Sequence, residues 1–281
     1  MKVIIDSGST KADWRLLTQL GVEHIETVGF SPVLHSAAFI QAALHKAVQT
    51  QQEIVSTTKQ IYYYGTGCWD EPRKKIIENA LQVEFPQAAI SVESDLFGAA
   101  RATCGITSGI VAILGTGSNS CFFNGAKIVH QVANLGYLLG DEGSGGDLGK
   151  ALLQAYFYKE LPEELGQKLA PYFPEGKTTL LDKLYNTERP NAYLASFTTF
   201  MAEHQAHPYI QKLIEGSFAS FIDRHLTKYP DHQLLPIHFV GSIAFYFQDF
   251  IKKLLAERDM QVGRIIKKPI DYLVKFHKNY E

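Results

Sequence analysis

Cysteine is scarce in this sequence, and its three copies, Cys68, Cys104 and Cys121, are odd in number and far apart. No C-x-x-C spacing occurs, so neither a disulfide framework nor a zinc or iron–sulfur site within one chain is indicated, and a reducing, cytoplasmic setting is expected. An excess of one charge sign is also missing, because 27 Lys and Arg stand against 29 Asp and Glu, a formal net charge of -2. The basic surface typical of nucleic-acid binding is therefore not predicted.

Long hydrophobic runs are missing too. The longest, such as residues 109–114, are far short of the roughly 20 residues that cross a bilayer. The amino terminus reaches Asp6 before the apolar core of a signal peptide can form. We therefore expect a soluble protein with no membrane partner. The 281 residues, 46% hydrophobic and 20% charged, have an ordinary globular composition and favour two domains.

The two common nucleotide-binding signatures, G-x-x-x-x-G-K-[ST] and G-x-G-x-x-G after a strand, are absent as well. Ten histidines are scattered along the chain, and His204 and His207 lie three residues apart without a third ligand, so a histidine metal site is not predicted. Any phosphate binding must therefore use other glycine-containing turns.

Alternating apolar and turn-forming residues predict a regular order of elements. Hairpins are expected over residues 2–17 and from Ile110 onward, and residues 62–67 read as a strand of core tyrosines with a polar glycine turn at its end. The remaining elements are helices and strands, namely a helix at 36–48, a strand at 88–92, a helix beginning at Asp95, mostly helix over 151–229, a strand at 237–240, a helix from 243 to about 257, and a helix at 269–280.

The two predicted hairpins resemble each other. Residues 3–9, Val-Ile-Ile-Asp-Ser-Gly-Ser, match residues 112–118, Ala-Ile-Leu-Gly-Thr-Gly-Ser, at an offset of roughly 109 residues. A chance match is the alternative. A true repeat predicts two halves that share a βββ-type start, each presenting a glycine turn to one cleft between them.

The first turn, Asp6-Ser7-Gly8-Ser9-Thr10-Lys11, suits an anion, because small residues leave backbone N–H groups accessible and Lys11 adds positive charge. Asp6, at the end of a buried strand, could hold Mg²⁺ through its water shell. On the turn alone, a tight hairpin capped by an Asp is the more common explanation.

Two more polar glycine stretches follow. Residues 114–120 form a second turn rich in small polar side chains, and residues 136–147 carry Asp141, Glu142 and Asp147 before a helix. Carboxylates beside exposed N–H groups suit a polyhydroxyl ligand, because an ionised Asp can accept from two hydroxyls. A long capping loop, whose acids favour the helix N-terminus, is the alternative.

Asp95 is the candidate general base. It stands at a strand-to-helix corner, with Ser94 as a plausible cap. In phosphoryl transfer a carboxylate need only take the hydroxyl proton as the new bond forms. Considered alone, such an Asp is more often just a helix N-terminal acid.

Taken in order, these features resemble the acetate and sugar kinase, Hsp70 and actin superfamily. The combination of residues 113–119 with residues 139–144, Leu-Gly-Asp-Glu-Gly-Ser, narrows the resemblance to the BadF/BadG/BcrA/BcrD ATPase family and its N-acetylglucosamine kinases. The resemblance implies an α/β protein of two RNase H-like (actin-like ATPase) domains with a central interdomain cleft. The expected domains are 1–105, with the C-terminal helix of about 266–281 packed back on it, and 106–265.

The resemblance also implies a role for each matching residue. Asp6 would lie near Mg²⁺, Asp95 would be the general base, and a homodimer that binds ATP and an amino sugar is expected. The other implied site residues are Gly8, Ser9, Thr10 and Lys11 in the first phosphate loop, Thr116 and Gly117 in the second, Ser118, Asn119, Gly136 and Asp141 at the sugar, and Gly241 and Ser242 at the adenosine.

The sequence departs from the family pattern at two places. Ser7 and Ser9 stand where glycines are common, and Ser31 stands near the place of an Asn that touches the sugar. The expected reaction is ATP-dependent phosphorylation of N-acetylglucosamine at its 6-hydroxyl. A glucosamine kinase and an N-acetylmuramic acid kinase remain open as alternatives. So do a nucleotide-dependent sensor and an ATPase activator of radical dehydratases. The shared iron–sulfur cluster of such an activator needs cysteines, and Cys104 and Cys121 do not have the required spacing.

Overall fold

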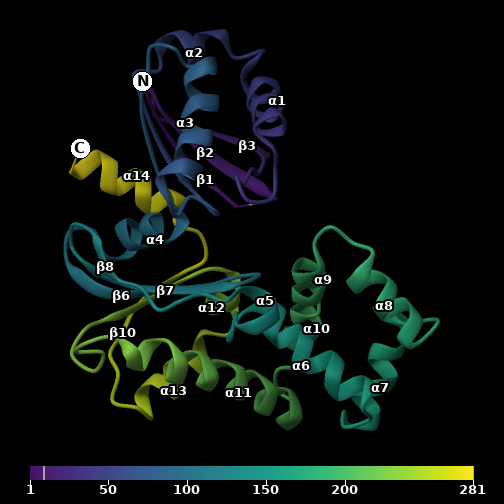
Figure 1. Cartoon of the computed structure of the whole chain (residues 1–281). Coiled ribbons are helices and arrows are strands. Elements are labelled where there is room, and N and C mark those ends of the chain that lie inside the picture. Colours follow the sequence, from purple (N-terminus) through teal and green to yellow (C-terminus); the bar gives the residue numbers. More distant parts are fainter. Residues whose placement is uncertain (9, 281) are drawn as a thin grey trace. The chain divides into compact units, whose positions relative to one another are not determined.

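The computed structural model describes residues 1–8 and 10–280. Ser9, which the sequence assigns to the first phosphate loop, lies outside the described residues. The chain forms two compact units, drawn in Figure 1, with the main-chain divisions after Thr107 and Lys267. We call residues 1–107 together with the described residues from Lys268 onward unit 1, and residues 108–267 unit 2.

Unit 1 contains a five-stranded sheet in the order β3-β2-β1-β4-β5. Its strands are β1 (Lys2–Ser7), β2 (Lys11–Leu17), β3 (Val22–Val28), β4 (Gln60–Gly65) and β5 (Ala89–Ser94). β1, β4 and β5 run parallel, whereas β2 and β3 are antiparallel to their neighbours. The parallel strands therefore end together at one edge, with Ser7, Gly65 and Ser94 in register.

Helices cover both faces of this sheet. They are α1 (Ala37–Val48), α2 (Gln52–Thr57), α3 (Glu71–Glu84), α4 (Asp95–Cys104) and α14 (Ile270–Asn279). Val3 and Ile5 join the core with Leu44 of α1 and Leu81 of α3, because alternate residues of a strand share a face. Ile4 points to the other face and is also buried, and α4 and α14 contact β1 on that side.

Unit 2 repeats this architecture. Its sheet has the order β10-β9-β6-β7-β8, and read from β8 to β10 every parallel and antiparallel relationship matches that of unit 1. The strands are β6 (Ser108–Leu114), β7 (Ser118–Asn124), β8 (Ile128–His130), β9 (Ile237–Val240) and β10 (Val262–Ile266). The internal repeat and the predicted fold class, α/β with two RNase H-like domains of the actin-like ATPase type, are therefore confirmed.

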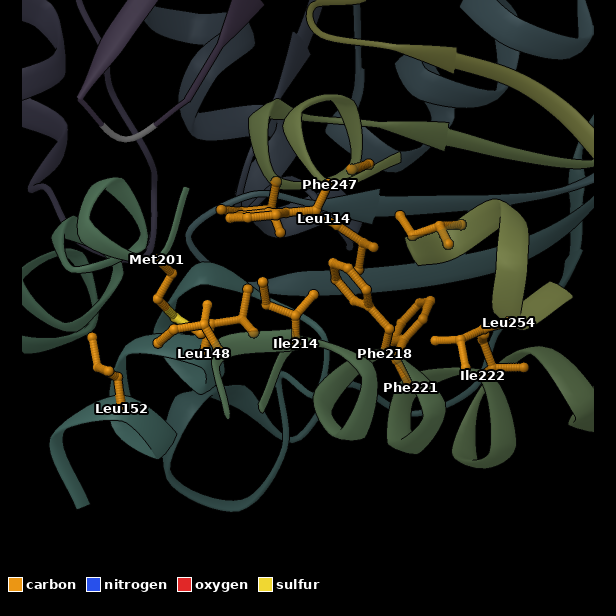
Figure 2. Packing of buried hydrophobic residues seen from close by; sticks show 14 of the residues in the cluster. Leu114, Leu148, Leu152, Met201, Ile214, Phe218, Phe221, Ile222, Phe247 and Leu254 are labelled. Carbon is orange, nitrogen blue, oxygen red and sulfur yellow. The ribbon is translucent and has the colours of Figure 1, made fainter. Parts of the chain in front are cut away.

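The helices of unit 2 pack around an apolar core. They are α5 (Gly136–Leu139), α6 (Gly145–Phe157), α7 (Glu163–Leu169), α8 (Lys177–Tyr185), α9 (Pro190–Ser196), α10 (Thr198–Glu203), α11 (Pro208–Arg224), α12 (Ser242–Tyr246) and α13 (Gln248–Ala256), with short 3₁₀ turns at Ala170–Tyr172 and Leu226–Lys228. Figure 2 shows Leu114 of β6 among side chains of α6, α11 and α13. This packing fixes the carboxyl end of β6, where the second glycine turn begins.

Several element predictions are confirmed, including both hairpins and the helix that begins at Asp95. The helix predicted from 243 to about 257 is divided, because Phe247 leaves helical geometry (φ -108°, ψ 23°), and its buried ring packs against Phe218 of α11. Within the described chain no helix combines the length and apolarity needed to cross a membrane.

Candidate active site

The carboxyl edge of the unit 1 sheet gathers the first group of predicted residues. The turn with Gly8 follows β1, Thr66 follows β4, and Asp95 follows β5. Because these three strands are parallel and end in register, their following residues converge at one edge. Residues that are several tens of positions apart in the sequence are thereby brought together within unit 1.

Asp95 is the first residue of α4, and the local sequence determines its position. The Ser94 hydroxyl accepts from the Phe97 N–H at 3.2 Å, and the Leu96 N–H donates to Asp95 Oδ1 at 2.8 Å. Burial raises the pKa of the Asp95 carboxyl, while hydrogen bonds from the Leu96 backbone and the Thr66 side chain oppose the rise. The carboxylate is thus held on two sides, and its raised pKa favours uptake of a proton.

Asp6 lies at the same edge, on β1. It is directly opposite Asp13 of β2, so both carboxylates project from the same face of the sheet. Burial raises the pKa of Asp6 to about 7, with Asp95 and Asp13 adding to the rise and Lys268 and Arg15 opposing it. Lys268 supplies a counter-charge at this position, because its Nζ lies 2.8 Å from Asp13 Oδ2.

The carboxylate oxygens gathered here are suitable ligands for a divalent cation. Mg²⁺ is usually bound by one or two carboxylates and keeps several waters, and a cation beside Asp6 would favour the ionised form that burial disfavours. Among the described residues, no group of three or more His, Cys, Asp or Glu is placed to hold a metal on its own. The residues therefore suit a largely hydrated ion rather than an all-protein cage.

The turn between β1 and β2 is held by backbone contacts. The Gly8 N–H donates to the Lys11 carbonyl at 3.0 Å, and the Gly29 N–H donates to the Thr10 carbonyl at 2.9 Å. A Cβ on Gly29 would lie 2.0 Å from the Gly8 carbonyl oxygen, so only glycine permits this approach. The Ser7 hydroxyl is buried and lies 3.3 Å from both the backbone N and the carbonyl oxygen of Phe30. Ser7 therefore does not occupy the outer surface of the turn.

Lys11 has a specific partner in this structure. Its Nζ lies 2.7 Å from Glu26 Oε1, and both side chains are largely exposed. The Glu26 hydrogen bond and charge raise the pKa of Lys11. A phosphate at the turn would compete with Glu26 for this ammonium group.

Ser31 lies near the same edge. Its Oγ would be 2.6 Å from a Cβ placed on Gly67, the residue after Thr66. Ser31 is buried, and its hydroxyl accepts from the Val33 N–H at 3.3 Å. The Ser31 hydroxyl, near the place where the resemblance puts a sugar-contacting Asn, thus already binds the backbone of its own loop.

In unit 2 the second glycine turn joins β6 to β7, and the start of α6 supports it. The Gly115 N–H donates to the Gly117 carbonyl at 3.0 Å. The Gly145 and Gly146 N–H groups donate to the carbonyls of Gly115 and Thr116 at 2.8 and 3.0 Å. Two N-terminal N–H groups of α6 therefore hold this turn in place.

Gly241 brings a third chain segment to the turn. Its φ is +123°, and a Cβ would lie 2.2 Å from the Leu114 carbonyl oxygen, so glycine is required on both counts. Ser242 begins α12 immediately after it. The predicted adenosine turn at Gly241 and Ser242 consequently adjoins the predicted second phosphate loop at Thr116 and Gly117, since β6 and β9 are neighbours in the sheet.

All four predicted sugar residues lie in this unit, and three of them are connected. Asp141 Oδ1 accepts from the Ser118 N–H at 3.0 Å and from Asn134 Nδ2 at 3.2 Å. Asn134 also donates to the Ser118 carbonyl and accepts from the Gly136 N–H at 2.6 Å. Burial raises the pKa of Asp141, while the hydrogen bonds from Ser118 and Asn134 oppose the rise. The fourth, Asn119, instead accepts from the Ser120 N–H and from Gln131.

Sequence reasoning missed three residues at these positions. Asn134 ties Ser118, Gly136 and Asp141 together, and its place two residues before a glycine in a polar stretch was the available signal. Thr66 was read only as the polar end of a strand, yet it bonds the Asp95 side chain. Asp13 was not singled out, since its place opposite Asp6 depends on strand register.

Comparison with known proteins gives a close likeness to a solved structure. No family model and no curated protein sequence matches this chain. The crystal structure of a candidate N-acetylglucosamine kinase from Porphyromonas gingivalis matches with 34% identity and a TM-score of 0.94, covering 100% of this chain and 99% of that chain.

More distant structures share the fold alone. A candidate N-acetylglucosamine kinase from Chromobacterium violaceum is 18% identical with a TM-score of 0.70, covering 98% of each chain. A ROK-family glucokinase from Streptomyces griseus, solved with glucose and AMPPNP, is 14% identical with a TM-score of 0.52, covering 99% of this chain and 98% of that chain. Given 34% identity along its whole length, this chain belongs to the family of the Porphyromonas gingivalis protein, a sugar kinase family with the actin-like ATPase fold.

Proposed function

We propose that this protein is an ATP-dependent sugar kinase of the BadF/BadG/BcrA/BcrD type that phosphorylates an amino sugar, N-acetylglucosamine at its 6-hydroxyl in the first instance. The observation that carries the proposal is the position of Asp95 at the carboxyl edge of the unit 1 sheet, near Asp6. The membership of a sugar kinase family supports it.

In this proposal Asp95 takes the proton of the sugar hydroxyl. The hydroxyl oxygen forms a bond to the γ-phosphorus as the bond from that phosphorus to the bridging oxygen breaks, and ADP leaves with the electron pair of the broken bond. The hydrogen bonds from Leu96 and Thr66 hold the carboxylate in one orientation for this step.

The other proposed site residues of the two units would bind the phosphates, the adenosine and the sugar. Asp6 would help to hold a hydrated Mg²⁺, which when bound neutralises phosphate charge. Gly8, Thr10 and Lys11 would serve one phosphate loop, and Thr116 and Gly117 the other. Gly241 and Ser242 would adjoin the adenosine, and Ser118, Asn119, Gly136 and Asp141 would hold the sugar. The network through Asn134 supports a shared role for Ser118, Gly136 and Asp141.

The experiment is a coupled ADP-release screen across glucose, glucosamine, N-acetylglucosamine, N-acetylmannosamine and N-acetylmuramic acid. We expect the largest kcat/KM with N-acetylglucosamine. Because the Ser31 hydroxyl binds its own loop, a preference for glucosamine is the main alternative. The absence of stimulation by any sugar would contradict the kinase proposal and favour an ATPase activator or a sensor.

The burial of Cys104 and Cys121 argues against an activator with a shared iron–sulfur cluster.

A further inference from the structure

One side of α4 faces β4 and the residue that follows it. Asp95, Gly98 and Arg101 are spaced three residues apart, so each lies beside the next on the helix surface. The Asp95 side chain is bonded by Thr66, the Gly98 backbone approaches Tyr64, and Arg101 Nη1 donates to the Tyr64 hydroxyl at 2.7 Å. These three residues of α4 are therefore attached to one short stretch of chain, Tyr64 to Thr66.

The contact at Gly98 sets how closely α4 approaches β4. A Cβ on Gly98 would lie 2.9 Å from Cβ and Cγ of Tyr64, closer than carbon atoms normally pack. Both Gly98 and Tyr64 are buried. The ring of Tyr64 thus fixes the distance between helix and strand, and its hydroxyl fixes the rotation of the helix through Arg101.

The direction of the hydrogen bonds follows from their chemistry. A guanidinium group can only donate, so the Tyr64 oxygen accepts from Arg101. The hydroxyl proton can then be donated to His277 Nε2, which lies 2.8 Å away. His277 belongs to α14, is fully buried, and its ring stacks on Tyr62 with centroids 3.8 Å apart. Figure 1 shows α14 beside α4, and the two helices are in contact.

We propose that Tyr64 is a positioning residue for the general base, and that His277 of the C-terminal helix completes the support. The inference rests on the proposed function, because it assigns the base role to Asp95. Tyr64 sets the position of α4, and α4 carries Asp95 on its first turn. A displacement of about 1 Å at a reacting group can reduce the rate about 100-fold, so a residue that never touches substrate can control turnover.

The test compares Tyr64→Phe with Tyr63→Phe. Tyr64→Phe keeps the ring that packs on Gly98 and removes only the hydroxyl. Tyr63 is the matched control, because it directly precedes Tyr64 on β4, is equally buried, and donates its hydroxyl proton to the Phe30 carbonyl at 3.1 Å on the opposite face. Tyr64→Phe loses its hydrogen bonds with Arg101 and His277, and Tyr63→Phe loses its bond to the Phe30 carbonyl, so the melting temperature should fall in both variants and further in Tyr64→Phe.

Two readouts separate positioning from general stability. Hydrogen exchange, measured by mass spectrometry on peptides covering 94–104, should be about five-fold faster in Tyr64→Phe and unchanged in Tyr63→Phe. In Tyr64→Phe we expect kcat to fall about ten-fold, with the KM for ATP within about two-fold of the wild-type value. His277→Leu should have the same effects, and His277→Gln, whose side-chain oxygen can accept the Tyr64 proton, should restore most of kcat.

Each outcome decides the proposal. Unchanged exchange and unchanged kcat in Tyr64→Phe overturn it, as does faster exchange with unchanged kcat, since α4 would then be held without consequence for Asp95. Equal effects from Tyr63→Phe also overturn it. If the wild-type protein releases no ADP with any sugar, the proposed function fails, and the exchange data alone then decide whether Tyr64 and His277 hold α4.

Discussion

Asp6 on β1 lies directly opposite Asp13 on β2, and the two carboxylates share one face of the unit 1 sheet. The arrangement is electrostatically unfavourable without a cation, because burial, Asp95 and Asp13 together raise the pKa of Asp6 to about 7. Lys268 partly offsets this through its ion pair with Asp13.

The raised pKa of Asp6 predicts a dependence of stability on pH. Unfolded Asp6 ionises near 3.8 and folded Asp6 near 7, so between these values the unfolded state binds fewer protons. The free energy of unfolding therefore falls as pH rises through this window and levels off above it. In the presence of a chelator, we expect the free energy of unfolding to fall less across this pH window in Asp6→Asn than in the wild-type protein, by at least about 1 kcal/mol. Urea denaturation of both proteins at a series of pH values measures it.

Two results bear on this prediction. Added Mg²⁺ should reduce the loss of stability above neutral pH in the wild-type protein, because it favours the ionised carboxylate. The same salt should have less effect on Asp6→Asn. Parallel pH profiles for the two proteins would show that Asp6 is not the group responsible.

Removal of the Asp95 charge should stop turnover without preventing nucleotide binding. We expect Asp95→Asn to lower kcat by about 100-fold or more, since general-base catalysis typically contributes that much. The Leu96 and Thr66 hydrogen bonds can still reach the amide oxygen, so the fold should be retained. Steady-state rates and calorimetric ATP titration test this. A wild-type rate in the variant would exclude Asp95 as the base.

The ion pair between Lys11 and Glu26 predicts opposite effects from its two members. Lys11→Met should weaken ATP binding, because it removes the only cation of the first phosphate turn at residues 6–11. Glu26→Gln should strengthen it by about two- to five-fold, because Lys11 no longer has to leave a carboxylate. Both side chains are exposed, so neither change should alter the unfolding free energy by more than about 1 kcal/mol. Weaker binding in Glu26→Gln would contradict competition.

Two substitutions of Asp141 separate the effect of its carboxylate from the effect of its backbone conformation. Its φ is 60°, a left-handed conformation that glycine adopts freely and alanine does not. Both Asp141→Gly and Asp141→Ala should raise the sugar KM about ten-fold or more, and the KM for ATP much less, because both remove the carboxylate that holds Ser118. Only the alanine variant should carry an added strain of about 1 kcal/mol, visible as a lower melting temperature. Equal changes in both KM values would reject Asp141 as a sugar ligand.

Much of the candidate site could be found from local sequence. Glycine turns after apolar strands, the Ser94 cap and the start of α4 at Asp95 depend on neighbouring residues, and the structure has them as predicted. The repeat of the two hairpins likewise reflects local patterns, and it correctly indicated two similar sheets. The repeat implied a third strand in each half, but no residue range was predicted for β3, because its side chains are mostly polar or exposed.

Other features depend on strand register and on contacts between elements. No local pattern pairs Asp6 with Asp13, places Asn134 between Ser118 and Asp141, or brings His277 to Tyr64, across 213 positions. Strand register and helix packing decide these contacts, because each depends on the whole buried surface rather than on the residues that meet. The sequence by itself determined which turns and carboxylates are available, and only the tertiary structure decided which of them share an environment and so acquire shifted pKa values and fixed orientations.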